Sequence, residues 1–182
     1  MNHRVFLYGT LCDPQLFEIV AGTPFTARPS TLAGYTTAWV EGENSALIVG
    51  QSAGRAHGLL VDMDDNAKER LDFYVFRFHY SLQEVEVESD GKKLPALIYM
   101  PKPGICSEGD AWSLSDWQKT HGPIDREAAI EYMRLLKTHC RESAAAAFPQ
   151  IRSRASSRLR ARQHPSPTAF QPHMAADEVL SL

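Results

Sequence analysis

The segment best suited by residue type and spacing to bind a ligand comprises residues 8–11, with the sequence Tyr-Gly-Thr-Leu. It follows a short apolar run at residues 5–7 and precedes Asp13 and Pro14, a pair typical of the start of a helix. A glycine between strand and helix lets the backbone approach a ligand, and N–H groups at a helix start can bind an anion such as a carboxylate. The segment is therefore either a ligand-binding loop or a tight strand-to-helix connection.

Two side chains in or beside this segment have more than one chemical use. Tyr8 can hydrogen-bond a ligand, or it can be a core aromatic residue whose hydroxyl group reaches the surface. Cys12 lies near the expected helix start, where a thiolate nucleophile is favoured. Because no sequence feature supplies a partner base, we interpret Cys12 as a buried structural residue.

The histidines and cysteines lack the spacing of a metal site. His57, His79, His121 and His139 form neither an H-x-H nor an H-E-x-x-H pattern. The three cysteines are far apart and contain no C-x-x-C pair. We therefore predict no metal, no cofactor and no disulfide framework.

A group of carboxylates follows a strand-like pattern. Glu84, Glu86 and Glu88 alternate with two valines, and residues 89–92 (Ser-Asp-Gly-Lys) have the composition of a hairpin turn. This pattern predicts a strand with one face in water, so these glutamates are interpreted as solvated side chains.

The other elements that must position the Tyr-Gly-Thr-Leu segment are short strands and a few helices. Strands are expected at residues 5–7, 31–40, 46–49, 56–63, 80–88 and 94–100, and helices at 14–21, 67–74 and from about 124. Short strands separated by glycine-containing turns are typical of a small closed or half-closed barrel. The sequence predicts an α+β domain over residues 1–137, a small mixed β-barrel with flanking helices.

The composition is that of an ordinary globular protein. The chain has 182 residues, 43% of them hydrophobic, and a formal charge of -3, which argues against nucleic-acid binding. No apolar run is long enough to span a membrane, and the first four residues lead into a strand and not into a signal-peptide core. We expect no membrane contact and a cytoplasmic location.

The C-terminal extension, residues 138–182, differs in composition from the rest. Residues 141–162 contain six arginines and one acidic residue, and Pro149 is expected to end any helix that begins in the preceding alanine run. The extension is predicted to be partly helical or partly disordered. The stretch from Arg152 to Arg162 is interpreted as a solvated linker or as a docking arm for a protein or domain, and binding of an anionic partner is a minor alternative.

Several of these features together resemble one protein family. The resemblance rests on residues 5–11, residues 58–61, Leu71 and Asp72, Tyr80, and residues 99–101. In this order they are similar to the γ-glutamylcyclotransferase-like proteins, which include the γ-glutamylamine cyclotransferases and the AIG2-like proteins. The resemblance spans residues 3–137 and implies a small mixed barrel with a cavity at its mouth.

The resemblance also implies a ligand and a reaction. In the family, the α-amine of a γ-glutamyl amine or peptide attacks its own γ-carbonyl, which releases an amine or amino acid and 5-oxoproline. Tyr8, the backbone amides around Gly9, Thr10 and Leu11, and Tyr80 are the implied substrate-binding residues. A carboxylate would serve as general base and then as general acid.

The sequence departs from the family at that carboxylate. The family has a Leu-Asp-x-x-Glu arrangement, whereas here Val75 stands at the glutamate position after Leu71 and Asp72. Loss of general acid–base catalysis alone lowers a rate by roughly 100-fold to 10,000-fold. The catalytic residue is therefore unknown, and we expect weak or altered activity.

Three alternatives follow from this substitution. The protein is a non-catalytic binding or interaction domain, or another group serves as the acid–base residue, or the alignment with the family is shifted by some residues. The substitute candidates are Glu84, His79 and Glu43.

A second, weaker resemblance concerns the tail. Residues 148–162 are similar to an arginine-rich segment that joins a cyclotransferase-like domain to a Nudix hydrolase domain in some bacterial proteins. The sequence contains no Nudix box pattern, so no pyrophosphatase activity is predicted.

Overall fold

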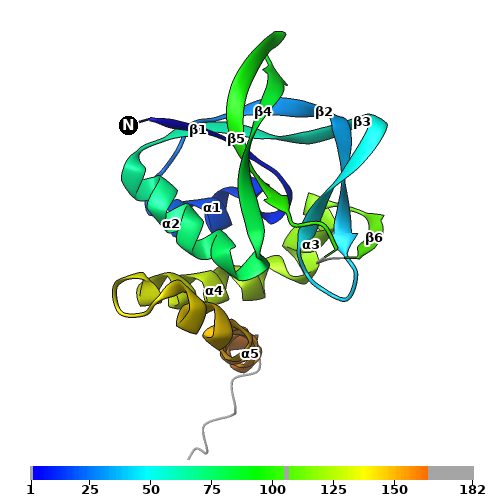
Figure 1. Ribbon diagram of the computed structural model, residues 1–182. Coiled ribbons are helices and arrows are strands. Elements are labelled where there is room, and N and C mark those ends of the chain that lie inside the picture. Colours follow the sequence, from blue (N-terminus) through cyan, green and yellow to red (C-terminus); the bar gives the residue numbers. More distant parts are fainter. Residues whose placement is uncertain (1, 105–106, 164–182) are drawn as a thin grey trace, which may run out of the picture.

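The strands of the protein close into a small ring, with the helices gathered on one side of it (Figure 1). The computed structural model describes residues 2–104 and 107–163. The elements are β1 (His3–Leu7), η1 (Gly9–Cys12), α1 (Pro14–Ala21), β2 (Ala27–Val40), β3 (Ala46–Met63), α2 (Asp65–Val75), η2 (Phe76–Phe78), β4 (Tyr80–Ser89), β5 (Lys92–Pro101), β6 (Glu108–Ala111), α3 (Leu114–Thr120), α4 (Gly122–Met133), η3 (Arg134–Lys137) and α5 (Arg141–Gln163). The predicted α+β class is confirmed.

The sheet is mixed and closes on itself. Its strand order is β3-β1-β5-β4-β2-β6, and an additional pairing between β3 and β2 completes the ring, so the expected barrel is confirmed. Strands β1 and β5 are parallel, and the other pairs are antiparallel. A register shift between Ala33 and Tyr35 marks a bulge at Gly34 in the pairing of β2 with β3.

The first strand lies between two hydrophobic cores. Phe6 belongs to the core inside the ring, whereas Val5 and Leu7 belong to the core between the ring and the helices. All three side chains are at most 1% exposed. A strand that is buried on both faces consists of a continuous run of apolar residues, and residues 5–7 have this pattern.

The predicted hairpin between β4 and β5 is confirmed. Asp90 and Gly91 have φ angles of 51° and 70°. Positive φ at both central residues is characteristic of the type I′ turn, whose twist matches that of the flanking strands.

Helix α5 contradicts the expectation that Pro149 ends a helix, because it continues from Arg141 to Gln163. Ala144, Ile151 and Ala155 are at most 1% exposed and belong to the core between the ring and the helices. A proline inside a helix costs about 3 kcal/mol, and burying a large aliphatic side chain such as Ile151 regains about 1.5–3 kcal/mol. Apolar burial on both sides of the proline thus offsets the local cost.

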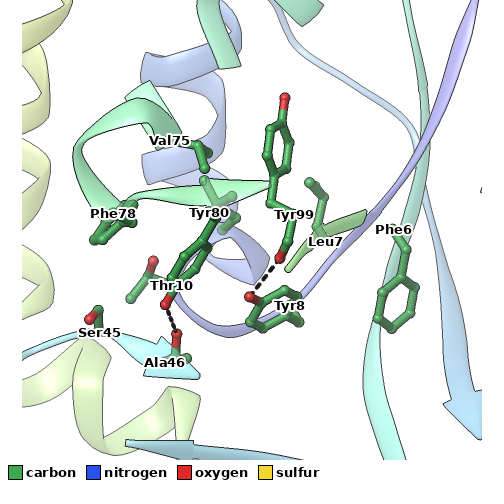
Figure 2. Close-up of a pocket in the computed structure, with 11 residues that line it drawn as sticks. Phe6, Leu7, Tyr8, Thr10, Ser45, Ala46, Val75, Phe78, Tyr80 and Tyr99 are labelled. Carbon is green, nitrogen blue, oxygen red and sulfur yellow. Dashed lines mark hydrogen bonds between the residues drawn. The ribbon is translucent and has the colours of Figure 1, made fainter. Parts of the chain in front are cut away.

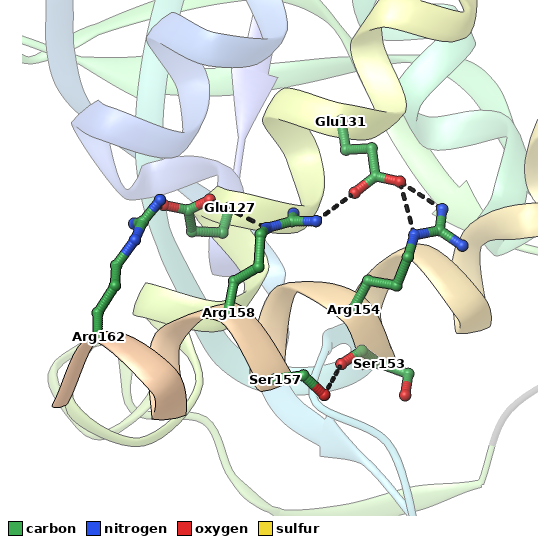
Figure 3. A network of polar contacts seen from close by, with 7 residues as sticks. All are labelled: Glu127, Glu131, Ser153, Arg154, Ser157, Arg158 and Arg162. Atoms are coloured by element: carbon green, nitrogen blue, oxygen red, sulfur yellow. Dashed lines mark hydrogen bonds and ion pairs between the residues drawn. The ribbon is translucent and has the colours of Figure 1, made fainter. Parts of the chain in front are cut away.

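The arginines of α5 pair with carboxylates of α4 (Figure 3). Arg158 Nη1 lies 3.0 Å from Glu131, and Arg162 Nη1 lies 2.5 Å from Glu127. Arg154 pairs with Glu131 as well. Burial of Glu131 would raise the pKa of its carboxyl group, but the hydrogen bonds from Arg154 and Arg158 lower the pKa below the usual value. The segment interpreted as a linker or docking arm is therefore a helix that packs on the domain.

Two sequence-based expectations lie outside the described residues: the state of Cys106 and the structure of residues 164–182. Within residues 2–104 and 107–163, no helix has the length and apolar composition needed to cross a membrane.

Candidate functional site

A pocket lies at the C-terminal end of β1, where the strand passes into η1 (Figure 2). Its lining comprises Phe6, Leu7, Tyr8, Thr10, Leu11, Ser45, Ala46, Val75, Phe78, Tyr80 and Tyr99. The structure thus brings together four of the five residues named as substrate-binding from the sequence, Tyr8, Thr10, Leu11 and Tyr80. We refer to this pocket as the strand-end pocket.

Gly9, the fifth of these residues, shapes the pocket without lining it. Its φ is +61°, and a Cβ atom at this position would lie 2.3 Å from the Cβ of Ala46. Glycine therefore provides both the left-handed backbone conformation and the close approach of the loop to the start of β3. The sequence predicted that the backbone at this glycine comes close to a ligand. In the structure it comes close to Ala46 at the start of β3.

The start of α1 is occupied by its own capping residue. The Leu16 N–H donates to Asp13 Oδ1 at 2.8 Å, as the Asp13–Pro14 pair predicts. This amide is therefore engaged within the protein and does not contribute to an anion site at the start of α1.

Asp13 also ties the loop to two other helices. Its carboxylate accepts two hydrogen bonds from Arg126, at 2.8 and 2.6 Å, and one from Gln118 at 2.8 Å. Burial by itself would raise the pKa of Asp13, but the hydrogen bonds from Arg126, Leu16 and Gln118 outweigh it and lower the pKa. The charged carboxylate thus holds the start of α1, directly after η1, to α3 and α4.

The tyrosine hydroxyl groups of the pocket donate to the protein. Tyr8 donates to the main-chain oxygen of Tyr99 at 2.8 Å, and Tyr80 donates to that of Ala46 at 3.1 Å (Figure 2). Tyr99 donates to Asp72, and burial and then this carboxylate raise the pKa of Tyr99 well above its usual value. In this arrangement the phenol oxygens can still accept a hydrogen bond from a ligand.

Val75, the last residue of α2, lines the strand-end pocket and is 2% exposed (Figure 2). Among the described residues, the only ionisable side chains in the lining are those of the tyrosines. No carboxylate or imidazole of the described residues therefore faces this pocket to move a proton near neutral pH.

The substitute candidates named from the sequence lie elsewhere. His79 follows η2 in a left-handed conformation, with φ of 56°, and is exposed, as is Glu84 on β4. Neither residue lines the pocket. Glu43 is exposed on the loop between β2 and β3, where its Oε2 accepts from Ser45 Oγ at 3.2 Å.

Cys12 has the environment of a buried thiol. Burial raises the pKa of the Cys12 thiol to about 12, and its Sγ donates to the main-chain oxygen of Leu7 at 3.4 Å. A thiol with such a pKa is not a nucleophile near neutral pH.

A second, larger cavity adjoins the strand-end pocket, and we call it the helix cavity. The two share Thr10, Ser45 and Phe78. The remaining lining residues are Gly42, Glu43, Asn44, Tyr74, Arg77, Trp117, Asp125, Ala145, Phe148, Pro149 and Arg152. The free volume is about 30 Å³ in the strand-end pocket and about 400 Å³ in the helix cavity. The first volume suffices for a water molecule or two, so a larger ligand must extend into the helix cavity.

The sequence did not single out Arg77, Asp125, Phe148 or Arg152 as site residues. The sequence does carry a signal for Arg77, because it is the one arginine in an aromatic-rich run at residues 73–80. The other three come together only through the packing of α4 and α5.

No group of three or more histidine, cysteine or acidic side chains that could hold a metal occurs in the part of the chain that the structure describes.

The sequence profile of the family described as "Gamma-glutamyl cyclotransferase, AIG2-like" matches residues 5–119. The chain belongs to this family. A curated relative, Protein AIG2 B of Arabidopsis thaliana, is 24% identical over 140 residues, which cover 73% of this chain and 80% of the relative. The profile match ends before α4, so α4 and α5 lie outside the part of the chain that the family profile covers.

Solved structures of related fold agree with this assignment. A protein described as "Gamma-glutamyl cyclotransferase" has a TM-score of 0.54 at 16% identity, and 76% of this chain and 88% of that chain are covered. A solution structure from Arabidopsis thaliana has a TM-score of 0.51 at 22% identity, with 76% of this chain and 94% of that chain covered. At these identities the likeness shows the cyclotransferase-like fold. The relatives named here give no support to a resemblance between residues 148–162 and the linker of a fusion protein.

Proposed function

We propose that this cyclotransferase-like protein binds a γ-glutamyl amine or peptide across the strand-end pocket and the helix cavity, and that it forms 5-oxoproline slowly or not at all. Family membership supports the ligand class. The observation that carries the reduced activity is the position of Val75, which lines the strand-end pocket, whereas no carboxylate among the described residues lines it.

The two pockets supply positioning but little proton transfer. Cyclisation needs the ligand to fold so that its α-amine approaches its γ-carbonyl, and a shaped cavity provides such proximity. The hydroxyl group of Thr10 and the tyrosine oxygens offer polar contacts to the glutamyl moiety. The α-ammonium must also lose a proton, and the leaving amine must gain one. Of the carboxylates in the helix cavity, Asp125 is paired with Arg152, so Glu43 is the group we assign to any residual activity.

A second candidate function is ligand binding without turnover. The same observation at Val75 favours it, because a pocket that keeps its shape but lacks an acid–base group retains affinity and loses rate. The two functions differ in one measurable quantity, the release of 5-oxoproline.

The deciding experiment compares wild type with Val75→Glu and Val75→Gln. Glutamate restores an acid–base group, whereas glutamine matches its size without titrating. We expect Val75→Glu to release 5-oxoproline from a panel of γ-glutamyl amines and peptides at least 100-fold faster than Val75→Gln, which should resemble wild type. Thermal melting with and without each ligand reports binding independently of turnover. Absence of a melting shift in wild type, together with absence of product in Val75→Glu, would refute the proposal.

A further inference from the structure

The wall of the helix cavity includes part of α5, which lies outside the family match. Helix α5 contributes Ala145, Phe148, Pro149 and Arg152, and the end of α2 with η2 contributes Tyr74, Arg77 and Phe78. The cavity is therefore built where a family-typical helix meets the C-terminal helix. We therefore expect ligand contacts that distinguish this chain from its relatives to lie in this cavity.

Arg77 is held in this wall by aromatic rings. Its guanidinium carbon lies 3.7 Å from the ring centre of Phe148, 4.0 Å from that of Tyr74 and 4.3 Å from that of Phe78. The ring faces attract the cation and fix the plane of the guanidinium. They bring no negative charge to balance it.

Two N–H groups of Arg77 have no hydrogen-bond acceptor. Nε and Nη1 are buried and without a partner among the described residues. The neighbouring Arg152 differs, because its Nε donates to Asp125 at 2.7 Å. Asp125 also accepts from Trp117 Nε1 at 3.2 Å, so each of its oxygens already accepts one hydrogen bond. Buried charged donors without acceptors are costly and rare in proteins, and each needs an explanation such as a ligand.

We propose that Arg77 forms a subsite for the carboxylate of the leaving group of a γ-glutamyl amino acid or peptide. This inference rests on the proposed function, in which the ligand spans both pockets and its glutamyl part lies at the side of the strand-end pocket. The leaving group then enters the helix cavity past the shared residues Thr10, Ser45 and Phe78. The cavity volume of about 400 Å³ suits an amino acid or a short peptide. Because the surrounding side chains cover Nε and Nη1, a neighbouring ring such as that of Phe148 has to shift before the carboxylate can reach either atom.

The charges of the cavity select a single carboxylate over a polyanion. Arg77 and Arg152 are balanced by Glu43 and Asp125, so the lining as a whole carries no excess positive charge. A phosphate-rich ligand would meet Glu43 and Asp125, whereas one carboxylate can use the planar fork of Arg77.

The test uses two ligands that differ only at this group, γ-glutamylglycine and its carboxamide, γ-glutamylglycinamide. Calorimetric titration of wild type should give a dissociation constant at least about 10-fold lower for the carboxylate, as expected for a charge-assisted hydrogen bond. Arg77→Met should remove this difference by weakening the binding of the carboxylate ligand. Arg160→Met is the matched control, because Arg160 is exposed on α5, donates a hydrogen bond to Ser156 and lines neither pocket.

Each outcome decides one question. Equal affinity of wild type for the two ligands overturns the subsite and leaves the proposed function intact. Absence of binding by either ligand overturns both. A preference for the carboxylate that persists in Arg77→Met also overturns the subsite. If Arg77→Met does not fold, Arg77→Lys takes its place, and a reduced preference is expected because lysine keeps the charge but lacks the fork. Glycine alone serves as a further probe, and it should bind far more weakly than γ-glutamylglycine.

Discussion

Asp13 and Arg126 are 113 residues apart in the chain and form a two-point ion pair, with Nε to Oδ1 at 2.8 Å and Nη2 to Oδ2 at 2.6 Å. The Asp13 side chain is 2% exposed, and that of Arg126 is 21% exposed. The pair joins the loop of the strand-end pocket to α4. It therefore couples the geometry of the pocket to a helix that the family match does not include.

Arg126→Met is expected to lower the free energy of unfolding by about 3 kcal/mol, because it leaves the buried charge of Asp13 without its partner. The value is taken at the low end of the range for buried pairs since Arg126 keeps some solvent contact. Urea unfolding measures it. The control is Arg4→Met, which removes an exposed pair with Asp62 at 3.0 Å and should cost less than about 1 kcal/mol. Equal effects of the two variants would contradict the role assigned to Asp13.

The same residue predicts a pH dependence. The pKa of Asp13 is lowered in the folded protein, so the unfolded chain binds this proton more readily than the native protein. Its contribution to stability is present above the unfolded value of about 3.9 and is lost as the pH falls through the folded value. Between about pH 5 and pH 3, the free energy of unfolding of wild type should therefore fall more steeply than that of Asp13→Asn. Parallel curves would show that Asp13 does not titrate as described.

The limits of prediction from sequence are visible in α5 and its neighbours. Residues that are neighbours in the sequence were sufficient to predict β1, the Asp13 cap, the hairpin at Asp90 and the fold class. The arginines of α5 resembled a linker because their partners, such as Glu131, lie on another helix. Pro149 was wrongly expected to end a helix because the local rule does not include burial of the helix against the domain.

The helix cavity was beyond sequence analysis for a similar reason. Arg77 and Phe148 are distant in the chain, and only tertiary packing brings the guanidinium and the ring together. Family resemblance located the strand-end pocket and the unusual residue Val75, but the family match does not reach the helix that forms the second wall.

Gly9→Ala should lower stability more than a glycine substitution without a steric clash. A Cβ atom at Gly9 meets Ala46 at 2.3 Å and is also placed at positive φ. We expect a loss of about 2–5 kcal/mol from strain and overpacking together. Gly42→Ala is the matched control, since its φ is +74° but no atom lies within 4 Å of the added Cβ. It should cost about 1 kcal/mol. Comparable melting temperatures for the two variants would show that the loop can move away from β3.

Glu43→Gln tests which group supports any residual cyclisation. Glu43 lines the helix cavity beside Ser45, whereas Glu84 is exposed on β4 and lines neither pocket. If Glu43 moves the protons, Glu43→Gln should reduce the release of 5-oxoproline by roughly 100-fold or more. Glu84→Gln should leave the rate unchanged. Binding of the ligand, measured by calorimetry, should persist in both variants, because glutamine still accepts the hydrogen bond from Ser45. An unchanged rate in Glu43→Gln would remove Glu43 as the acid–base group and would favour binding without turnover.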